Sequence, residues 1–127
     1  MRIGIPKESY DGERRVAATP TTVGKLRDLG FEVCVQTGAG VQATFSDAAY
    51  EEAGASISSD ADSFWAESDL VLKVRAPEPD EVGLLREGSS LISFLWPAQN
   101  EALVESLRAR NITSFAMDAI PRISRAQ

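Results

Sequence analysis

Short apolar runs and amphipathic segments alternate along the whole chain. The apolar runs have the length and the content of valine, isoleucine and leucine that buried strands have. They predict strands at residues 2–5, 31–36, 70–74, 91–95 and 112–117, and a shorter one at 55–58. The intervening segments predict helices at residues 20–29, 47–52, 80–87 and 100–110, and a helical turn that begins at residue 60 or 62.

Specific residues mark where these helices begin and end. Thr19 followed by Pro20 is a strong start, because threonine caps a helix and proline suits its first position. Gly30 ends the same helix. Near-continuous apolar strands between helices indicate a parallel sheet that helices cover on both faces. We therefore predict an α/β fold, Rossmann-like or flavodoxin-like, with right-handed crossovers.

The composition narrows the possible functions. The length of 127 residues predicts one domain. The net charge of −6 argues against nucleic acid or an anionic membrane surface as a direct partner. The chain has no histidine and one cysteine, which excludes serine–histidine and cysteine–histidine catalysis and nearly all zinc sites. We predict no metal, no internal disulfide and a reducing compartment. No apolar run is long enough to cross a bilayer, and the chain starts in a strand rather than a signal peptide.

A glycine-rich segment follows the second predicted strand. Residues 38–43, Gly-Ala-Gly-Val-Gln-Ala, fit the G-x-G-x-x-A pattern of a dinucleotide-binding turn. That turn must run straight into a helix whose N-terminus faces the pyrophosphate. Here Thr44 and Phe45 come before the next cap at Ser46, and the segment follows the second strand rather than the first. We therefore expect an ordinary glycine turn without the dinucleotide fingerprint.

Two basic residues are candidates for contact with an anion. Arg15 precedes the first helix, and its planar guanidinium suits a carboxylate or a phosphate, although a solvated surface arginine is the commoner case. Lys73 stands inside the apolar run 70–74. Its ammonium must either extend to the sheet edge or pair with an anion, and a substrate anion is one candidate.

Four other residues lie within or shortly after predicted strands. Trp96 and Gln99 follow the run 91–95 and are able to line a pocket, but a tryptophan more often packs beneath a loop. Cys34 is expected to be a small, inert core residue that faces a helix. Asp118 follows the last strand as a site carboxylate, a cap or a solvent-facing residue.

The last seven residues are the strongest indication of a binding site. Residues 121–127, Pro-Arg-Ile-Ser-Arg-Ala-Gln, follow the final predicted strand and contain two arginines and a glutamine. In open α/β sheets, ligands bind beyond the carboxyl ends of the strands. We therefore expect part of a binding loop here, and we expect the other half of the site on a segment beyond residue 127.

Motifs spread along the chain point to one family. They are Met-Arg-Ile-Gly-Ile-Pro-Lys-Glu at 1–8, Glu-Arg-Arg-Val-Ala-Ala-Thr-Pro at 13–20, Gly-Ala-Gly at 38–40, Gly-Ala at 54–55, Leu-Lys-Val at 72–74, Ser-Phe-Leu-Trp-Pro-Ala-Gln-Asn at 93–100, Met-Asp at 117–118 and the segment 121–127. In register, they resemble the amino terminus of the alanine dehydrogenase and nicotinamide nucleotide transhydrogenase family. The last segment is similar to the transhydrogenase branch specifically. The resemblance implies that residues 1–127 are the N-terminal subdomain of an NAD(H)-binding alpha subunit. It places the fingerprint-bearing domain downstream.

The resemblance also implies roles for single residues and separates the two branches. In alanine dehydrogenases, an arginine and a lysine that match Arg15 and Lys73 hold pyruvate, and a catalytic histidine stands where this chain has Trp96. In transhydrogenases, residues that match Arg122 and Gln127 contact the nucleotides from a loop over the nicotinamide. Because the chain has no histidine, the resemblance favours the transhydrogenase branch. It implies that Arg122 and Gln127 are catalytic and that these two, with Arg15 and Lys73, bind the cofactor.

The implied reaction is direct hydride transfer from NADH, bound between this domain and the downstream one, to NADP⁺ on a separate subunit. In the full complex, a membrane subunit couples it to proton translocation. The implied partners are the NADP-binding and membrane subunits and a second alpha subunit in a homodimer. The implied location is the cytoplasmic side of the inner membrane, held there by the partner subunits. The fragment alone is expected to be inactive.

Two alternatives stay open. An alanine dehydrogenase-like, NAD-dependent oxidoreductase is supported by Arg15 and Lys73 and opposed by Trp96. A non-catalytic binding or assembly module fits if the natural chain is this short.

Overall fold

A computed structural model describes residues 1–119, so Arg122 and Gln127 lie outside the described residues. The strands are β1 (Arg2–Ile5), β2 (Glu32–Gln36), β3 (Ser56–Ser58), β4 (Leu70–Leu72), β5 (Ser90–Ser93) and β6 (Thr113–Ala116). The α-helices are α1 (Pro20–Asp28), α2 (Asp47–Glu52), α3 (Ala61–Glu67), α4 (Pro79–Leu84) and α5 (Glu101–Ala109). Two short 3₁₀ helices are η1 (Val41–Ala43) and η2 (Met117–Ala119).

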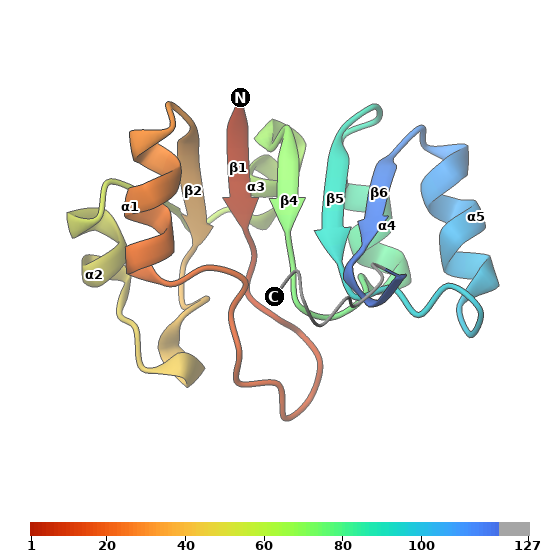
Figure 1. Ribbon diagram of the computed structural model, residues 1–127, viewed down its shortest axis with the longest axis horizontal. Coiled ribbons are helices and arrows are strands. Elements are labelled where there is room, and N and C mark those ends of the chain that lie inside the picture. The colour runs from red at the N-terminus through yellow and green to blue at the C-terminus, as the bar shows by residue number, and fades with distance from the viewer. Residues whose placement is uncertain (120–127) are drawn as a thin grey trace, which may run out of the picture.

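The six strands form one all-parallel sheet in the order β3-β2-β1-β4-β5-β6. Figure 1 labels these strands from β2 to β6 in this order, without β3. This is the strand order of the doubly wound dinucleotide-binding fold. The order reverses between β1 and β4, which pair in the middle of the sheet. The predicted α/β fold with a parallel sheet and helices on its faces is confirmed.

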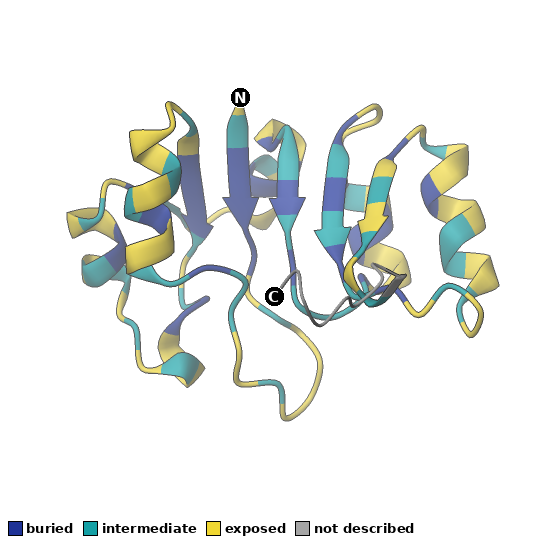
Figure 2. Ribbon diagram, in the orientation of Figure 1, coloured by how far each residue is buried: buried dark blue, intermediate teal, exposed yellow. Residues whose placement is uncertain are grey.

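Two hydrophobic clusters lie on the two faces of the sheet. One contains Val23 of α1 and Tyr50 of α2 together with residues of β1 and β2. The other contains Phe64 and Trp65 of α3 together with residues of α4 and α5; α3 and α4 lie behind the sheet in Figure 1. Figure 2 shows that burial is concentrated in the central strands, while β6 at the edge is largely uncovered. Cys34 is fully buried in the second cluster with α3, as expected.

The caps of α1 follow the predicted signals. The Thr19 hydroxyl accepts a hydrogen bond from the Thr22 N–H at 3.2 Å, and Pro20 is the first helical residue. Gly30 follows the helix with a φ of +96°, in the left-handed region that glycine adopts without a steric penalty. Helix α1 therefore begins at the predicted residue and ends one residue before the predicted end.

Two strands, β4 and β5, stop two residues earlier than their apolar runs predict. β4 ends at Leu72, because the N–H groups of Val74 and Arg75 donate to the Glu8 carboxylate instead of a neighbouring strand. β5 ends at Ser93, and two residues later the Leu95 N–H donates to the Asp118 carboxylate. Side-chain carboxylates thus replace strand partners at the carboxyl edge of the sheet.

Residues 38–43 form the expected turn rather than the start of a phosphate-binding helix. The segment ends in the short helix η1, and Asp47 holds its beginning by accepting from the Gly38 N–H at 2.9 Å. A Cβ on Gly40 would lie 2.6 Å from the Tyr50 ring, so packing alone requires this glycine. Within residues 1–119, no helix is long and apolar enough to span a membrane.

Candidate functional site

The carboxyl ends of β1 and β4 bring two connecting segments together. Because β1 and β4 pair in parallel, the loop at residues 6–19 lies beside the segment at 73–78. Figure 1 shows this loop extending beyond the carboxyl edge of the sheet. The place is the point where strand order reverses, and ligands of doubly wound folds bind there.

Glu8 and Lys73 form a buried ion pair at this edge. The Lys73 Nζ lies 2.8 Å from a Glu8 carboxylate oxygen, and their side chains are 1% and 2% exposed. The same carboxylate accepts the N–H groups of Val74 at 2.9 Å and Arg75 at 3.0 Å. Of the two interpretations of Lys73, pairing with an anion holds, and the anion comes from the protein itself. Contact between Lys73 and a cofactor stays a prediction.

A second carboxylate approaches the same ammonium. Glu81, in the first turn of α4, has an oxygen 3.8 Å from the Lys73 Nζ and accepts the Glu78 N–H at 2.8 Å. Burial is the main cause that raises the pKa of Glu81 above its usual value. Two acidic side chains therefore lie beside one buried ammonium, and Glu8 is the nearer of the two.

Glu13 joins two arginines, Arg15 from the loop after β1 and Arg75 from the segment after β4. Its carboxylate accepts from Arg15 through Nε at 3.0 Å and Nη2 at 2.9 Å, and from Arg75 through Nε at 2.7 Å. The Arg15 guanidinium is the first cause that holds the pKa of Glu13 far below its usual range. The Arg75 guanidinium carbon also lies 4.0 Å from the centre of the Tyr10 ring, a cation–π contact.

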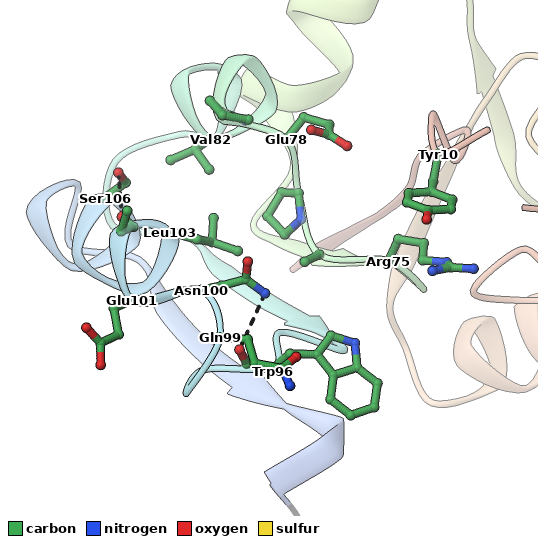
Figure 3. Close-up of a pocket in the computed structure, with 14 residues that line it drawn as sticks. Tyr10, Arg75, Glu78, Val82, Trp96, Gln99, Asn100, Glu101, Leu103 and Ser106 are labelled. Atoms are coloured by element: carbon green, nitrogen blue, oxygen red, sulfur yellow. Dashed lines mark hydrogen bonds between the residues drawn. The ribbon is translucent and has the colours of Figure 1, made fainter.

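Two hollows open at this edge. One of about 310 Å³ is lined by Arg15, Lys73 and Met117 among apolar residues of β4 and β5. The other, of about 500 Å³, lies between the Tyr10 and Arg75 side and helix α5 (Figure 3). The first hollow combines an apolar wall with a partly exposed arginine, which suits a planar ring that carries an anionic group.

Trp96 lies at the mouth of the larger hollow. The indole is 52% exposed, its ring stacks on Phe94 at 6.2 Å, and its φ of +48° is unusual for a bulky residue. Asp118 holds this backbone, because its carboxylate accepts the N–H groups of Leu95 at 2.8 Å and Trp96 at 3.0 Å. The expectation that Trp96 packs beneath a loop is wrong, since the polar turn before α5 exposes the ring. Asp118 acts as a cap for that turn.

The structure brings Arg15 and Lys73 to the same edge, and both line the smaller hollow. Sequence reasoning missed Glu8, Glu13 and Glu81 as their partners. A usable signal was present, because a lysine inside an apolar strand requires a nearby anion. The loop after the first strand has several carboxylates, and the strand order decides which of them reach Lys73.

Comparisons with known proteins give the family. The family model "Alanine dehydrogenase/PNT, N-terminal domain" matches residues 4–127. The chain is 49% identical over its full length to the NAD(P) transhydrogenase subunit alpha of Haemophilus influenzae and covers 24% of that protein. It is 42% identical over 120 residues, 94% of this chain and 32% of the relative, to the alanine dehydrogenase of Mycobacterium tuberculosis.

A solved structure agrees. The crystal structure of transhydrogenase from Sinorhizobium meliloti matches with a TM-score of 0.94 and 38% identity, covering all of this chain and 38% of that one. The chain thus spans a quarter to two fifths of the length of these relatives. It belongs to the alanine dehydrogenase/PNT family and corresponds to that family's N-terminal domain.

Proposed function

We propose that this chain is the N-terminal subdomain of a transhydrogenase alpha subunit and provides one wall of its NAD(H) site. The observation that carries the proposal is the uninterrupted match, 49% identical over all 127 residues, to a transhydrogenase alpha subunit. The position of Arg15 and Lys73 at the reversal point of the strand order supports it. The domain with the dinucleotide fingerprint, a second alpha subunit and the NADP-binding and membrane subunits complete the proposed enzyme on the cytoplasmic side of the membrane.

The residues present fit a nucleotide in part. The Arg15 side chain is 62% exposed beside the smaller hollow and retains donors that Glu13 does not use, which suits a phosphate or carboxylate oxygen. The glycine turn at 38–43 offers no pyrophosphate cradle, so the diphosphate belongs to the downstream domain. When bound, the reduced nicotinamide supplies the hydride, which passes to NADP⁺ to give NAD⁺ and NADPH.

The protein's task in this reaction is orientation. No side chain of the chain needs to form a covalent bond or move a proton at the reacting carbon. Arg122 offers a cation to a phosphate or to an acidic partner group, and the Gln127 amide orients the nicotinamide or its ribose without adding charge. Both residues lie outside the described part of the chain, and their roles are proposals from the resemblance.

The direct test uses a complete alpha subunit that begins with this chain, mixed with an NADP-binding subunit. We expect NADH-dependent reduction of an NADP⁺ analogue, followed by its absorbance. The same subunit should not oxidise NADH when pyruvate and ammonia are added. Steady NADH oxidation that depends on pyruvate and ammonia would overturn the assignment. It would establish the alanine dehydrogenase alternative, which the 42% identity to an alanine dehydrogenase supports.

Gln127→Asn in that subunit tests the orienting role. The change removes one methylene, keeps the amide and leaves the charge unchanged. A misplacement of about 1 Å slows hydride transfer on the order of 100-fold, or roughly 2.7 kcal/mol of barrier, with little change in NADH affinity. Stopped-flow single-turnover rates paired with NADH titration measure both quantities. An unchanged rate removes Gln127 from the site, and a parallel loss of affinity makes it a binding residue only.

A further inference from the structure

Two guanidinium groups at the carboxyl edge share the single carboxylate of Glu13. Arg15 contacts it through Nε, Nη2 and the backbone N–H, at 3.0, 2.9 and 2.8 Å. Arg75 contacts it through Nε at 2.7 Å. The Glu13 side chain is only 4% exposed, whereas those of Arg15 and Arg75 are 62% and 39% exposed. A buried acceptor therefore fixes the inner edge of each cation and leaves the outer edge open to solvent.

The two cations belong to different hollows. Arg15 lines the hollow of about 310 Å³ together with Met117. Arg75 lines the hollow of about 500 Å³ and lies over the Tyr10 ring, as Figure 3 shows. Glu13 lies between them and determines the direction of both arginines. The two arginines explain why the Glu13 carboxylate is buried although residues 11, 12, 14 and 15 around it are exposed.

We infer that Glu13 is a positioning residue that holds the Arg15 guanidinium with its outer donors aimed at an anionic group of a nucleotide in the smaller hollow. The inference rests on the proposed function, in which Arg15 contacts that nucleotide. A free arginine loses much rotamer freedom when it binds a ligand. Because the Glu13 carboxylate already holds the Arg15 guanidinium through two N–H groups and accepts the Arg15 backbone N–H as well, less freedom is lost on binding.

Glu13 has a second effect of opposite sign, which makes the inference testable. Its negative charge repels an anionic ligand, so removing that charge strengthens binding if charge dominates. The Arg15 side chain is mostly exposed, and salt screens charges there. Salt does not reduce the effect of losing the fixed orientation of the Arg15 guanidinium. This loss therefore outweighs the gain in positive charge and determines the change in NADH affinity. Glu13→Gln, which keeps the shape and removes the charge, should therefore weaken NADH binding although the site becomes more positive.

The test titrates NADH against complete alpha subunits that carry Glu13→Gln, Arg15→Met or both. Glu13→Gln should raise the NADH dissociation constant about tenfold and leave the single-turnover hydride rate of bound NADH near wild type. In the Arg15→Met background, the same change should have no further effect, because its target is gone. Asp69→Asn, which breaks an arginine–carboxylate pair with Arg86 at the opposite edge of the sheet, is the matched control and should leave NADH affinity unchanged.

A second measurement separates this inference from the proposed function. In the 127-residue chain, the Arg15 Nε–H should exchange slowly with solvent by nuclear magnetic resonance, and Glu13→Gln should make it exchange rapidly. Rapid exchange in the wild type overturns the positioning role, as does an NADH dissociation constant that falls or stays constant in Glu13→Gln. An equal effect of Glu13→Gln with and without Arg15 also overturns it. Failure of the wild-type subunit to transfer hydride refutes only the proposed function.

Discussion

The two ends of the sheet carry the same kinds of charged residue in different surroundings. At the amino end, Asp69 accepts the Arg2 N–H at 2.7 Å and pairs with Arg86 at 2.6 Å, with the Asp69 and Arg86 side chains 32% and 47% exposed. At the carboxyl end, the Glu8 and Lys73 side chains are 2% and 1% exposed. Exposed pairs contribute about 0–1 kcal/mol, whereas removing one partner of a buried pair costs about 3–5 kcal/mol. The buried ion pair, whose disruption costs more, thus lies at the carboxyl end, where it fixes the loops of the candidate site.

Lys73→Met should have the largest effect on stability. It leaves Glu8 and Glu81 buried without their cation, and we expect the free energy of unfolding to fall by about 3–5 kcal/mol. Urea unfolding followed by circular dichroism measures this fall. Lys25→Met, at an exposed position of α1, is the control, and its free energy of unfolding should stay within about 0.5 kcal/mol of wild type. If Lys73→Met lowers the free energy of unfolding by less than about 1 kcal/mol, the buried cluster of Lys73, Glu8 and Glu81 stabilises the fold no more than an exposed ion pair does.

Glu8→Gln should come next. The amide keeps the shape and one acceptor but loses the charge that faces Lys73 and two backbone N–H groups. We expect a loss of about 2 kcal/mol, because hydrogen bonds to charged groups contribute about 1.5–3 kcal/mol. Asp69→Asn is the comparison at the amino end and should lose about 1 kcal/mol. If Glu8→Gln and Asp69→Asn lower the free energy of unfolding in urea equally, the two ends of the sheet do not differ in this respect.

As the pH falls, Glu13 at the carboxyl end should lose more of its contribution to the free energy of unfolding than Asp69 at the amino end. The pKa values of Glu13 and Asp69 are both lowered, the first mainly by Arg15 and the second mainly by the Arg2 N–H. A lowered folded-state pKa gives stability that is complete above the unfolded value, 4.5 for Glu13, and is lost as the pH falls toward the folded value. Glu13→Gln should therefore flatten the acid side of the stability curve more than Asp69→Asn does. A steeper curve in Glu13→Gln would contradict the assigned sign.

The smallest effect should come from Glu81→Gln, although Glu81 belongs to the buried cluster. Burial raises the pKa of this carboxyl, so its ionised form destabilises the folded state at pH values above the folded pKa. Glutamine cannot ionise, so it avoids this destabilisation. At neutral pH we expect the free energy of unfolding to change by less than about 0.5 kcal/mol or to rise slightly. A loss as large as that of Glu8→Gln would show that both carboxylates act as charged partners of Lys73.

Much of the fold follows from local patterns, whereas the partners within the site do not. The Thr19–Pro20 start, the glycine at 30 and the apolar runs predict the elements, because caps and periodicity act over a few residues. The bonds of Lys73 to Glu8 and of Leu95 to Asp118 join residues 65 and 23 positions apart. Only the strand order decides such pairs, and it also explains why β4 and β5 end early. The prediction that Trp96 packs beneath a loop is wrong because the exposure of its ring depends on a turn that the distant Asp118 carboxylate holds.

The central proposal is that the carboxyl edge of the sheet forms one wall of a dinucleotide site, and that NADH binds only when a further domain completes this site. Titration of NADH by fluorescence or calorimetry, against this chain and against a complete alpha subunit, tests it most directly. We predict saturable binding to the complete subunit and very weak or no binding to the 127-residue chain. A dissociation constant of about 1 µM for the chain alone, near −8 kcal/mol, would contradict the account and make the glycine segment 38–43 a binding element after all.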